Sequence, residues 1–329
     1  MRVGKDRLVE DLTRMGIEEG DHLALGVSLK SIGYVEGGPD ALLDALLETV
    51  GDDGTIFLPA HTMGFRLYLL KPGKRVRMSD GRMFSPWDYV FDPDTTPPVT
   101  GLVPTTLWKR NGSFRSSHPI NSIVAMGKDA RYLTSQHDDG ASPFSPYSTL
   151  ADMDGKALFI GLNGRLVGLR HRAQRLAGLT EGFPALGGVR YRRRDSSIGL
   201  YKRVPSGCAK ELPRLNGELF ERGVLHRGNL GEAECLTGKA EEILECLSNR
   251  LRSNPERVIC DDPRCLWCRC IETRYDLRHR MKGEHLFQRS RLARSVTSVI
   301  NSLRLRNWYW AEKGMGLYAR ALRLAEKAI

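Results

Sequence analysis

The chain has 329 residues, of which 41% are hydrophobic, so it is long enough to bury a substantial core and has the composition of a folded globular protein. It has no run of 18 apolar residues, and its first stretch, MRVGKDRLVEDLTRMG, alternates charged and apolar side chains; we therefore expect no membrane-spanning helix, no secretion signal and a cytoplasmic location. The net charge of +11 favours anionic partners, such as phosphates, nucleotide cofactors or nucleic acid, over cationic ones.

The first 60 residues predict a strand–helix–strand unit. Residues 5–15 have the spacing of an amphipathic helix, and residues 22–28 (HLALGVS) form a short apolar run typical of a strand. Gly-Gly-Pro opens a second amphipathic helix over residues 39–50, and the strand TIFLP follows a glycine turn. Elements of this length and order predict a parallel pair of strands with a right-handed crossover.

The rest of the chain predicts further alternation of strands and helices. Residues 64–98 are aromatic, basic and rich in proline, which predicts an irregular excursion over the surface. The other expected elements, in chain order, are helix 101–110, strand 121–126, helix 129–135, strand 156–162, a helix that carries His171, hairpin 185–204, and helices 208–222 and 239–251.

The loop in residues 26–38 combines Ser28 and Lys30 with Gly33, Gly37 and Gly38. A strand that leads through a glycine-containing loop into a helix is typical of sites for phosphate or carbonyl oxygens, because backbone N–H groups point at the ligand. The loop has neither the phosphate-loop pattern nor the dinucleotide pattern of glycines, so its spacing alone leaves a structural turn as the alternative.

A second polar stretch, FRSSHPINSIVAMG, precedes the strand predicted at 121–126. Its donors Arg115, His118 and Asn121 suit a polar ligand. The alternative is local turn chemistry, because Ser and Asn cap turns and Pro119 restricts the residue before it.

A third stretch, KALFIGLNGRLVGLRHRAQRLAG, contains a buried strand that ends at Gly161 and a helix that carries His171. Active sites of α/β proteins gather at the carboxyl ends of strands, and a histidine there can serve as a general base near neutral pH. The alternative is a hydrogen-bonded histidine on a packed helix.

These stretches occur in an order that resembles the aminoglycoside 3-N-acetyltransferase-like (antibiotic N-acetyltransferase) family. The resemblance rests on SLKSIGYVEGG with GDDGTIFLPA, on FDPDTTPPVTGLVP with FRSSHPINSIVAMG, and on SPFSPYSTLADMDGKALFIGLNGRLVGLRHRAQ, and it covers residues 1 to about 250. It implies an α/β fold with a mixed, largely parallel central sheet flanked by helices, and transfer of an acetyl or other acyl group from coenzyme A to an amine. It also implies a coenzyme A site lined by Ser28, Leu29, Lys30, Ile32, His118 and Ser122.

The family's active-site pattern resembles T-x-x-H-x-x-E, of which this chain keeps only His171. Gly168 and Gln174 stand in place of the threonine and the glutamate, and Gly26 stands where the family often has a histidine. By this resemblance His171 is the general base for direct attack of the amine on the thioester, with any carboxylate partner supplied by Asp195 or Glu211. The alternative is a catalytically silent binding protein that holds an anionic ligand or nucleic acid through its basic tail.

The positive charge near the expected site limits which acceptor the protein can bind. Arg165, Arg170, Arg172 and Arg175 would repel a polycationic aminoglycoside. We therefore expect an amine on a neutral or anionic carrier, such as an amino sugar on a nucleotide or a biosynthetic intermediate. The sequence leaves the oligomeric state open.

The segment CDDPRCLWCRC predicts a structural Zn²⁺ site with ligands Cys260, Cys265, Cys268 and Cys270. His279 or His285 could replace one thiolate. The alternatives are reduced cysteines beside Trp267 and, less favoured because nothing else in the chain indicates electron transfer, an iron–sulfur cluster. Cys208, Cys235 and Cys246 are expected to be ordinary buried thiols. We accordingly expect an acyl-CoA-dependent N-acetyltransferase-like domain over residues 1–252, followed by a Cys-rich segment and basic helical tail over residues 253–329.

Overall fold

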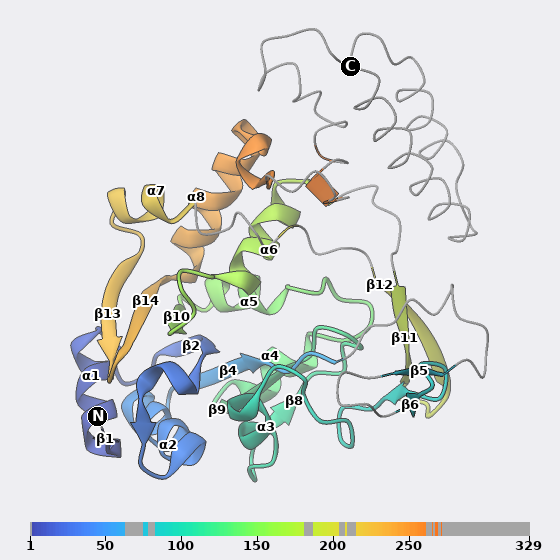
Figure 1. Ribbon diagram of the computed structural model, residues 1–329, viewed down its shortest axis with the longest axis horizontal. Coiled ribbons are helices and arrows are strands. Elements are labelled where there is room, and N and C mark those ends of the chain that lie inside the picture. The colour runs from blue at the N-terminus through green and yellow to red at the C-terminus, as the bar shows by residue number, and fades with distance from the viewer. Residues whose placement is uncertain are drawn as a thin grey trace, which may run out of the picture.

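The computed structural model describes residues 2–62, 75–77, 83–180, 187–203, 208, 215–260, 265, 267–268 and 271. A seven-stranded sheet lies between two layers of helices (Figure 1). Its strands in spatial order are β13 (His226–Leu230), β14 (Ala233–Lys239), β10 (Lys156–Ile160), β2 (His22–Val27), β4 (Thr55–Pro59), β9 (Ile123–Gly127) and β8 (Phe114–Arg115).

The sheet is mixed, as the sequence predicted, but parallel pairing is confined to its three central strands. β10 pairs parallel with β2, and β2 pairs parallel with β4. The other four pairings in this sheet are antiparallel. The sheet is therefore less parallel than expected, and the parallel centre is where strand carboxyl ends meet at one edge.

Alternating side chains of the central strands supply two separate cores. Ile56 and Leu58 of β4 pack on one face with α1 (Lys5–Arg14), α2 (Gly38–Val50) and α3 (Leu102–Trp108). Phe57 points to the other face, which is covered by α4 (Ala130–Ser135), α5 (Pro146–Asp152), α6 (Val167–Leu176) and α8 (Ala240–Ser253). Successive side chains of β4 thus point to opposite faces of the sheet and are buried on both, as in a strand covered by helices on each side.

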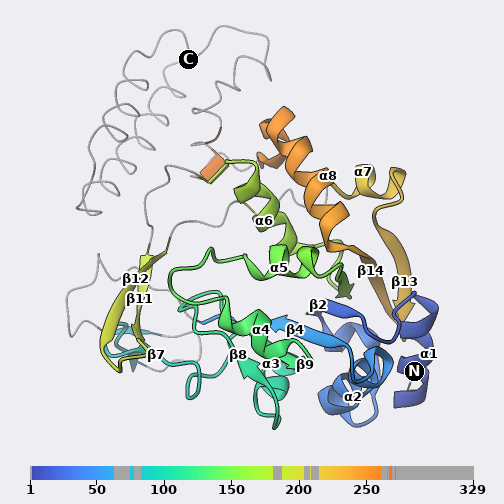
Figure 2. The same ribbon diagram turned by 180° about the vertical axis from the view of Figure 1, so that it is seen from behind.

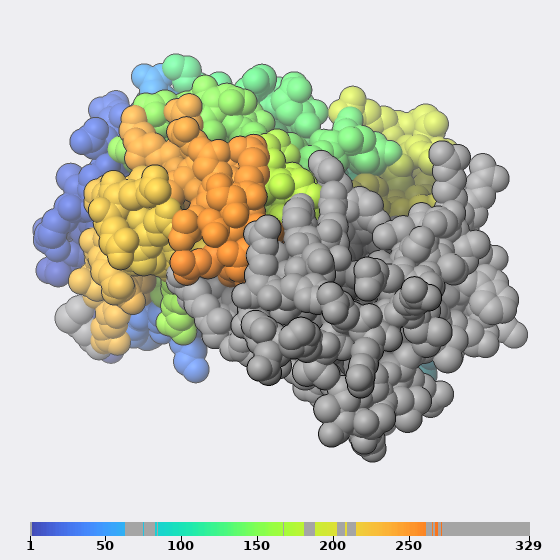
Figure 3. Space-filling view, turned by 90° about the horizontal axis from the view of Figure 1, so that it is seen from above, coloured from blue at the N-terminus to red at the C-terminus, as the bar shows by residue number. Residues whose placement is uncertain are grey.

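The remaining elements lie around this framework. A three-stranded sheet of β12 (Ile198–Arg203), β11 (Gly187–Arg192) and β7 (Val90–Phe91) stands beyond β8, at the opposite end from β13 (Figures 1 and 2). Helix α7 (Asn216–Glu221) lies beside α8 at the surface (Figure 3). The short elements are β1 (Arg2–Val3), η1 (Leu29–Ile32), β3 (Tyr34–Val35), β5 (Val76–Arg77), β6 (Met83–Phe84) and η4 (Pro255–Val258).

Most predicted elements are confirmed to within a few residues, including the strand–helix–strand unit of β2, α2 and β4. Helix α5 and the hairpin of β13 and β14 were not predicted. The described part of the helix expected at 208–222 is helical only from Asn216 to Glu221. Within the described residues, no helix has both the length and the apolar character needed to cross a membrane.

The boundary expected at residue 252 falls inside α8. Beyond it, Val258, Cys260, Trp267 and Ile271 are buried in the same core as α5 and α6. The division into two parts stays a prediction. Cys270, Glu211, His279, His285 and the basic tail lie outside the described residues.

Candidate active site

The carboxyl ends of β2 and β10 are joined directly. The Ser28 N–H donates to the Ile160 carbonyl at 2.9 Å, and the Ser31 hydroxyl donates to the Gly161 carbonyl at 3.3 Å. The Oγ atoms of Ser28 and Ser31 are 2.8 Å apart. Gly161 has φ +65°, and a Cβ there would lie 2.3 Å from Ser31 Cβ, so this close approach requires glycine. The predicted coenzyme loop and the strand that leads into the His171 helix thus meet at one edge of the sheet.

An open pocket of about 430 Å³ lies against this loop and the start of α2. Its exposed members are one cation, Lys30, and two large apolar side chains, Tyr34 and Leu102, which are 64% and 60% exposed. Helix α2 begins after Gly37, which has a left-handed backbone and no side chain that caps the helix. The pocket therefore combines apolar surface, a positive charge and a helix start that no side chain caps. The complete lining is Leu29, Lys30, Gly33, Tyr34, Val35, Gly38 and Leu102.

Two of the predicted coenzyme residues in this loop line the pocket and two do not. Leu29 and Lys30 line it. Ser28 is half-buried and bonded to Ser31, and Ile32 is fully buried in the core beneath the loop. The side chains of Ser28 and Ile32 thus stabilise the loop from its buried side.

His171 is 5% exposed on α6, and its Nδ1 lies 3.0 Å from Gln174 Oε1. The Gln174 amide nitrogen donates to the Cys208 carbonyl at 3.4 Å, so the amide oxygen faces the histidine. An amide oxygen can only accept, and Nδ1 must therefore carry the proton. Nε2 is then the ring nitrogen that carries the lone pair. Gln174 therefore fixes this tautomer without a negative charge; that it stands in place of a family glutamate stays a prediction.

Bulky neighbours fill the space beside the two unusual glycines. A Cβ at Gly168 would lie 2.0 Å from both Cζ and the hydroxyl of Tyr147, a residue that is 4% exposed. A Cβ at Gly26 would lie 2.7 Å from Phe159 and 2.8 Å from Leu162. The space that larger side chains would need at positions 168 and 26 is thus taken by an aromatic ring in each case. Sequence reasoning missed Tyr147, because its contact with Gly168 is visible only in the fold.

His118 is fully buried and bonded on both ring nitrogens. The backbone N–H groups of Ile120 and Asn121 donate to its Nδ1, at 3.3 and 3.0 Å, so Nε2 carries the proton and donates to the Tyr201 hydroxyl at 3.1 Å. Its ring stacks on that of His137, with centroids 4.6 Å apart. Burial lowers the pKa of His118 to about 3, which keeps the ring neutral.

Ser122, the other predicted coenzyme residue of this stretch, is also fully buried, and its hydroxyl donates to the Ala60 carbonyl at 2.6 Å. The side chains of His118 and Ser122 are thus occupied in holding residues 116–122 against the sheet. A part for either in coenzyme binding stays a prediction.

Three arginines of α6 have no carboxylate partner within the described part of the chain. Arg170 is fully buried, and although it donates to the Gly164 carbonyl and to Asn216 Oδ1, its Nε and Nη1 have no partner. Burial lowers its pKa to about 9. Among the described residues Arg172 donates to two serine hydroxyls, and Arg175 Nη1 has no hydrogen-bond partner. Helix α6 therefore carries positive charge that described protein carboxylates do not neutralise.

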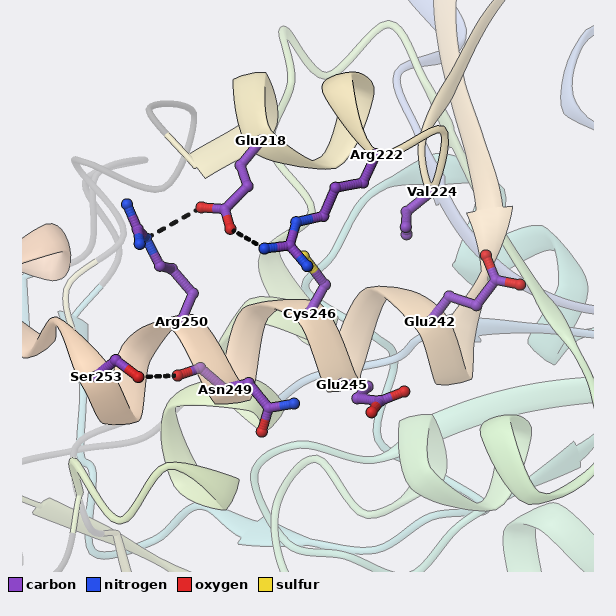
Figure 4. Close-up of a pocket in the computed structure, with 9 residues that line it drawn as sticks. All are labelled: Glu218, Arg222, Val224, Glu242, Glu245, Cys246, Asn249, Arg250 and Ser253. Carbon is purple, nitrogen blue, oxygen red and sulfur yellow. Dashed lines mark hydrogen bonds and ion pairs between the residues drawn. The ribbon is translucent and has the colours of Figure 1, made fainter.

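Two other pockets have different chemistry. One of about 560 Å³, at the β11–β12 hairpin, is lined by Asp92, Asp94, Asp138, Asp139 and Asp195 together with Arg192, Arg193 and Arg194. Asp195 lies there in an exposed turn, where its carboxylate accepts from Ser197, so it is engaged away from His171. The other, of about 390 Å³, lies between α7 and α8, and Glu218 there forms ion pairs of 3.0 Å with Arg222 and Arg250 (Figure 4).

Three of the four predicted zinc ligands lie together, and Cys208 lies with them. The Sγ atoms of Cys208, Cys260, Cys265 and Cys268 all lie within 4.8 Å of one another. Cys208 is a buried thiol, as predicted, but the fold also brings it to the three cysteines of the C-terminal segment, which the sequence did not predict. Cys270, the fourth predicted ligand, lies outside the described residues.

Comparisons with known proteins agree with this architecture. The family described as aminoglycoside 3-N-acetyltransferase matches residues 25–252. Aminoglycoside N(3)-acetyltransferase IX of Micromonospora chalcea is 30% identical over 272 residues, which cover 78% of this chain and 95% of that protein. Aminoglycoside N(3)-acetyltransferase VII of Streptomyces paromomycinus is 28% identical over 261 residues, covering 74% and 89%.

Solved structures show the same fold. The complex of AAC-IIIb with CoASH superposes with a TM-score of 0.66 at 22% identity and covers 77% of this chain and 98% of that one. The neutron and X-ray structure of sisomicin-bound AAC-VIa gives a TM-score of 0.64 at 25% identity, covering 77% and 99%. The chain belongs to the aminoglycoside 3-N-acetyltransferase family and is a CoA-dependent N-acetyltransferase.

Proposed function

We propose that the protein transfers an acetyl group from coenzyme A to the amine of a small molecule on a neutral or anionic carrier, with His171 as general base. The observation that carries this proposal is the junction of Ser28 and Ser31 with Ile160 and Gly161. It joins the coenzyme loop to the strand that leads into the helix of His171, whose tautomer is fixed by Gln174.

The pocket beside α2 suits the coenzyme. Its apolar members, Leu29, Tyr34 and Leu102, offer contact area for the pantetheine chain or the adenine ring. Lys30 and the uncapped N-terminus of α2 favour phosphate groups. The carboxylate of Asp40 in the first turn of that helix pairs with Arg110 at 2.8 Å, but Arg110 also pairs with Asp44 at 2.7 Å, so the negative charge of Asp40 is only partly offset. Lys30 and the helix start are therefore the features here that favour an anion.

In the reaction, the amine nitrogen attacks the thioester carbonyl while His171 Nε2 takes a proton from that nitrogen. The tetrahedral intermediate collapses with release of the coenzyme thiolate, which is then protonated. Donors in the loop would stabilise the oxyanion, which is usually the largest contribution to such catalysis. Gln174 orients the ring but brings no negative charge to stabilise the imidazolium, so we expect a smaller contribution from the base than a carboxylate partner would give.

The unneutralised arginines of α6 support an acceptor on a neutral or anionic carrier. A polycationic acceptor beside Arg170, Arg172 and Arg175 would meet like charge in a partly desolvated region. The space filled by Tyr147 beside Gly168 also supports an acceptor that differs from those of relatives with a threonine there.

A second candidate acceptor class is an aminoglycoside. It is favoured by the five aspartates around the pocket at the β11–β12 hairpin, and by sisomicin as the ligand of AAC-VIa. Three arginines in the same pocket offset part of that negative charge, and Arg192 is already paired with Asp92 at 3.0 Å. We therefore rank this acceptor class second.

Titration calorimetry with acetyl-CoA, followed by thiol release with a panel of amines, tests the proposal. The panel includes nucleotide-linked amino sugars, simple amino sugars and sisomicin. We expect acetyl-CoA binding and the fastest thiol release with an uncharged or anionic acceptor. That release should slow by about 10²-fold or more in His171→Asn and be retained in His226→Asn, a control on the exposed face of β13. Fastest release with sisomicin would favour the second acceptor class. No thiol release from any amine, with binding to polyanions instead, would favour a silent binding protein.

A further inference from the structure

The four clustered thiols come from two distant parts of the chain. Cys208 follows β12, whereas Cys260, Cys265 and Cys268 follow η4. The Sγ atoms of Cys260 and Cys268 are 3.5 Å apart, far beyond the roughly 2.05 Å of a disulfide. Tetrahedral zinc with Zn–S bonds of about 2.3 Å holds its sulfurs about 3.8 Å apart. The observed separations, from 3.5 Å for that pair to at most 4.8 Å for any pair, are therefore within about 1 Å of the tetrahedral value.

The surroundings of the cluster favour a closed, structural site. Cys208, Cys260 and Cys268 are buried, Cys265 is half-buried, and Val258, Trp267 and Ile271 are buried beside them in the same core. Four thiolates complete a tetrahedral shell and leave no position for substrate or water. Thiolate is also the softest ligand in proteins and selects zinc over calcium or magnesium.

We propose that Cys208, Cys260, Cys265 and Cys268 form a structural tetrathiolate zinc site, and that this site positions the catalytic histidine. The carbonyl of Cys208 accepts from the Gln174 side chain, and Gln174 holds His171 Nδ1. One residue thus ligates the metal through its sulfur and orients the amide of Gln174 through its backbone. The metal acts through two hydrogen bonds on the ring, so Cys208 and Gln174 are positioning residues. This second part rests on the proposed role of His171, whereas the metal site does not.

Metal content tests the site without reference to activity. Elemental analysis of protein purified without chelator should give about one zinc per chain, and a mercurial thiol reagent should release it. The cobalt-substituted protein should show the intense visible bands of tetrahedral thiolate coordination. Cys208→Ser, Cys260→Ser, Cys265→Ser and Cys268→Ser should each lose most of the metal.

Matched controls define the ligand set. Cys246→Ser on α8 and Cys235→Ser on β14 should keep the metal, because neither belongs to the cluster. Cys270→Ser should also keep it. Protein that binds no zinc under these conditions, or a Cys208→Ser variant with full zinc beside a Cys270→Ser variant without it, would overturn the ligand set. The wild-type stoichiometry and the cobalt spectrum decide the matter even if a variant fails to fold.

Imidazole ¹⁵N chemical shifts test the link to His171. The chain has eight histidines, and His171→Asn identifies the signal of this one. In the zinc-loaded protein the signal should show a protonated Nδ1 and an unprotonated Nε2. Removal of zinc, or Gln174→Leu with zinc retained, should turn it into an exchange-averaged mixture of tautomers, and Gln174→Glu should restore the fixed tautomer. An unchanged His171 signal after complete zinc removal would refute the link and leave the metal site standing.

Discussion

Replacing Gly168 by alanine tests how tightly Tyr147 fills the site. Glycine to alanine inside a helix normally stabilises by roughly 0.5–1 kcal/mol, and no left-handed backbone opposes the change here. The new Cβ, however, would lie 2.0 Å from Tyr147 Cζ, a distance that requires the ring to move. The ring is 4% exposed and packs edge-on against Phe57 with centroids 5.5 Å apart, so it has no solvent to move into.

Overpacking of this kind costs about 1–3 kcal/mol, and we expect Gly168→Ala to destabilise by that amount despite its gain in helix propensity. Urea unfolding followed by circular dichroism measures it. Gly217→Ala in α7 is the control, because nothing lies within 4 Å of its Cβ and it should be neutral or stabilising. Tyr147→Ala should cost about 3–5 kcal/mol by itself, and adding Gly168→Ala to it should then cost nothing. A Gly168→Ala protein as stable as the parent would refute the filled-space reasoning.

Two further outcomes follow from the same structure. Burial holds the folded-state pKa of His118 at about 3 against about 6.5 in the unfolded chain, so its contribution to stability is complete above pH 6.5 and is lost as the pH falls. We expect the free energy of unfolding to fall by about 2 kcal/mol between pH 7 and pH 5 because of this group. In His118→Asn the free energy of unfolding should depend less steeply on pH. A slope of urea midpoint against pH that is unaltered in the variant would contradict this. Lys30→Ala should weaken acetyl-CoA binding about 2–5-fold at low salt and less at high salt, because salt screens charges at an exposed site. Lys109 is also exposed, and Lys109→Ala should leave the affinity unchanged. Titration calorimetry at two salt concentrations measures both effects.

The fold was predictable where local signals are strong. The apolar run of β2, the Gly-Gly-Pro start of α2 and the continuous apolar TIFLP of β4 each specify one element and its ends. The β13–β14 hairpin was missed because β13 buries little: His226, Arg227 and Asn229 are exposed, so the strand lacks an alternating apolar pattern. Its pairing depends on β10, far away in sequence.

The candidate site was predictable only in part, because some of its contacts also join residues that are far apart in sequence. His171 was predicted from a strand end and a family pattern, whereas Gln174 was named only as a departure from that pattern and its contact with His171 was not predicted. The aromatic ring that fills the space beside Gly168, and the thiol of Cys208, join the site through contacts between segments separated by about 20 and 50 residues. No local pattern marks such a contact. His118 was predicted to line the coenzyme site, but in the structure both of its ring nitrogens form hydrogen bonds within the protein.

The most direct measurement is single-turnover acetyl transfer from acetyl-CoA by the zinc-loaded protein and by His171→Asn, with the best acceptor of the amine panel. We expect unchanged acetyl-CoA affinity in the variant and a rate that falls by about 10²-fold or more, the lower end of the usual contribution of a general base. A variant that transfers acetyl at the parent rate would contradict this expectation.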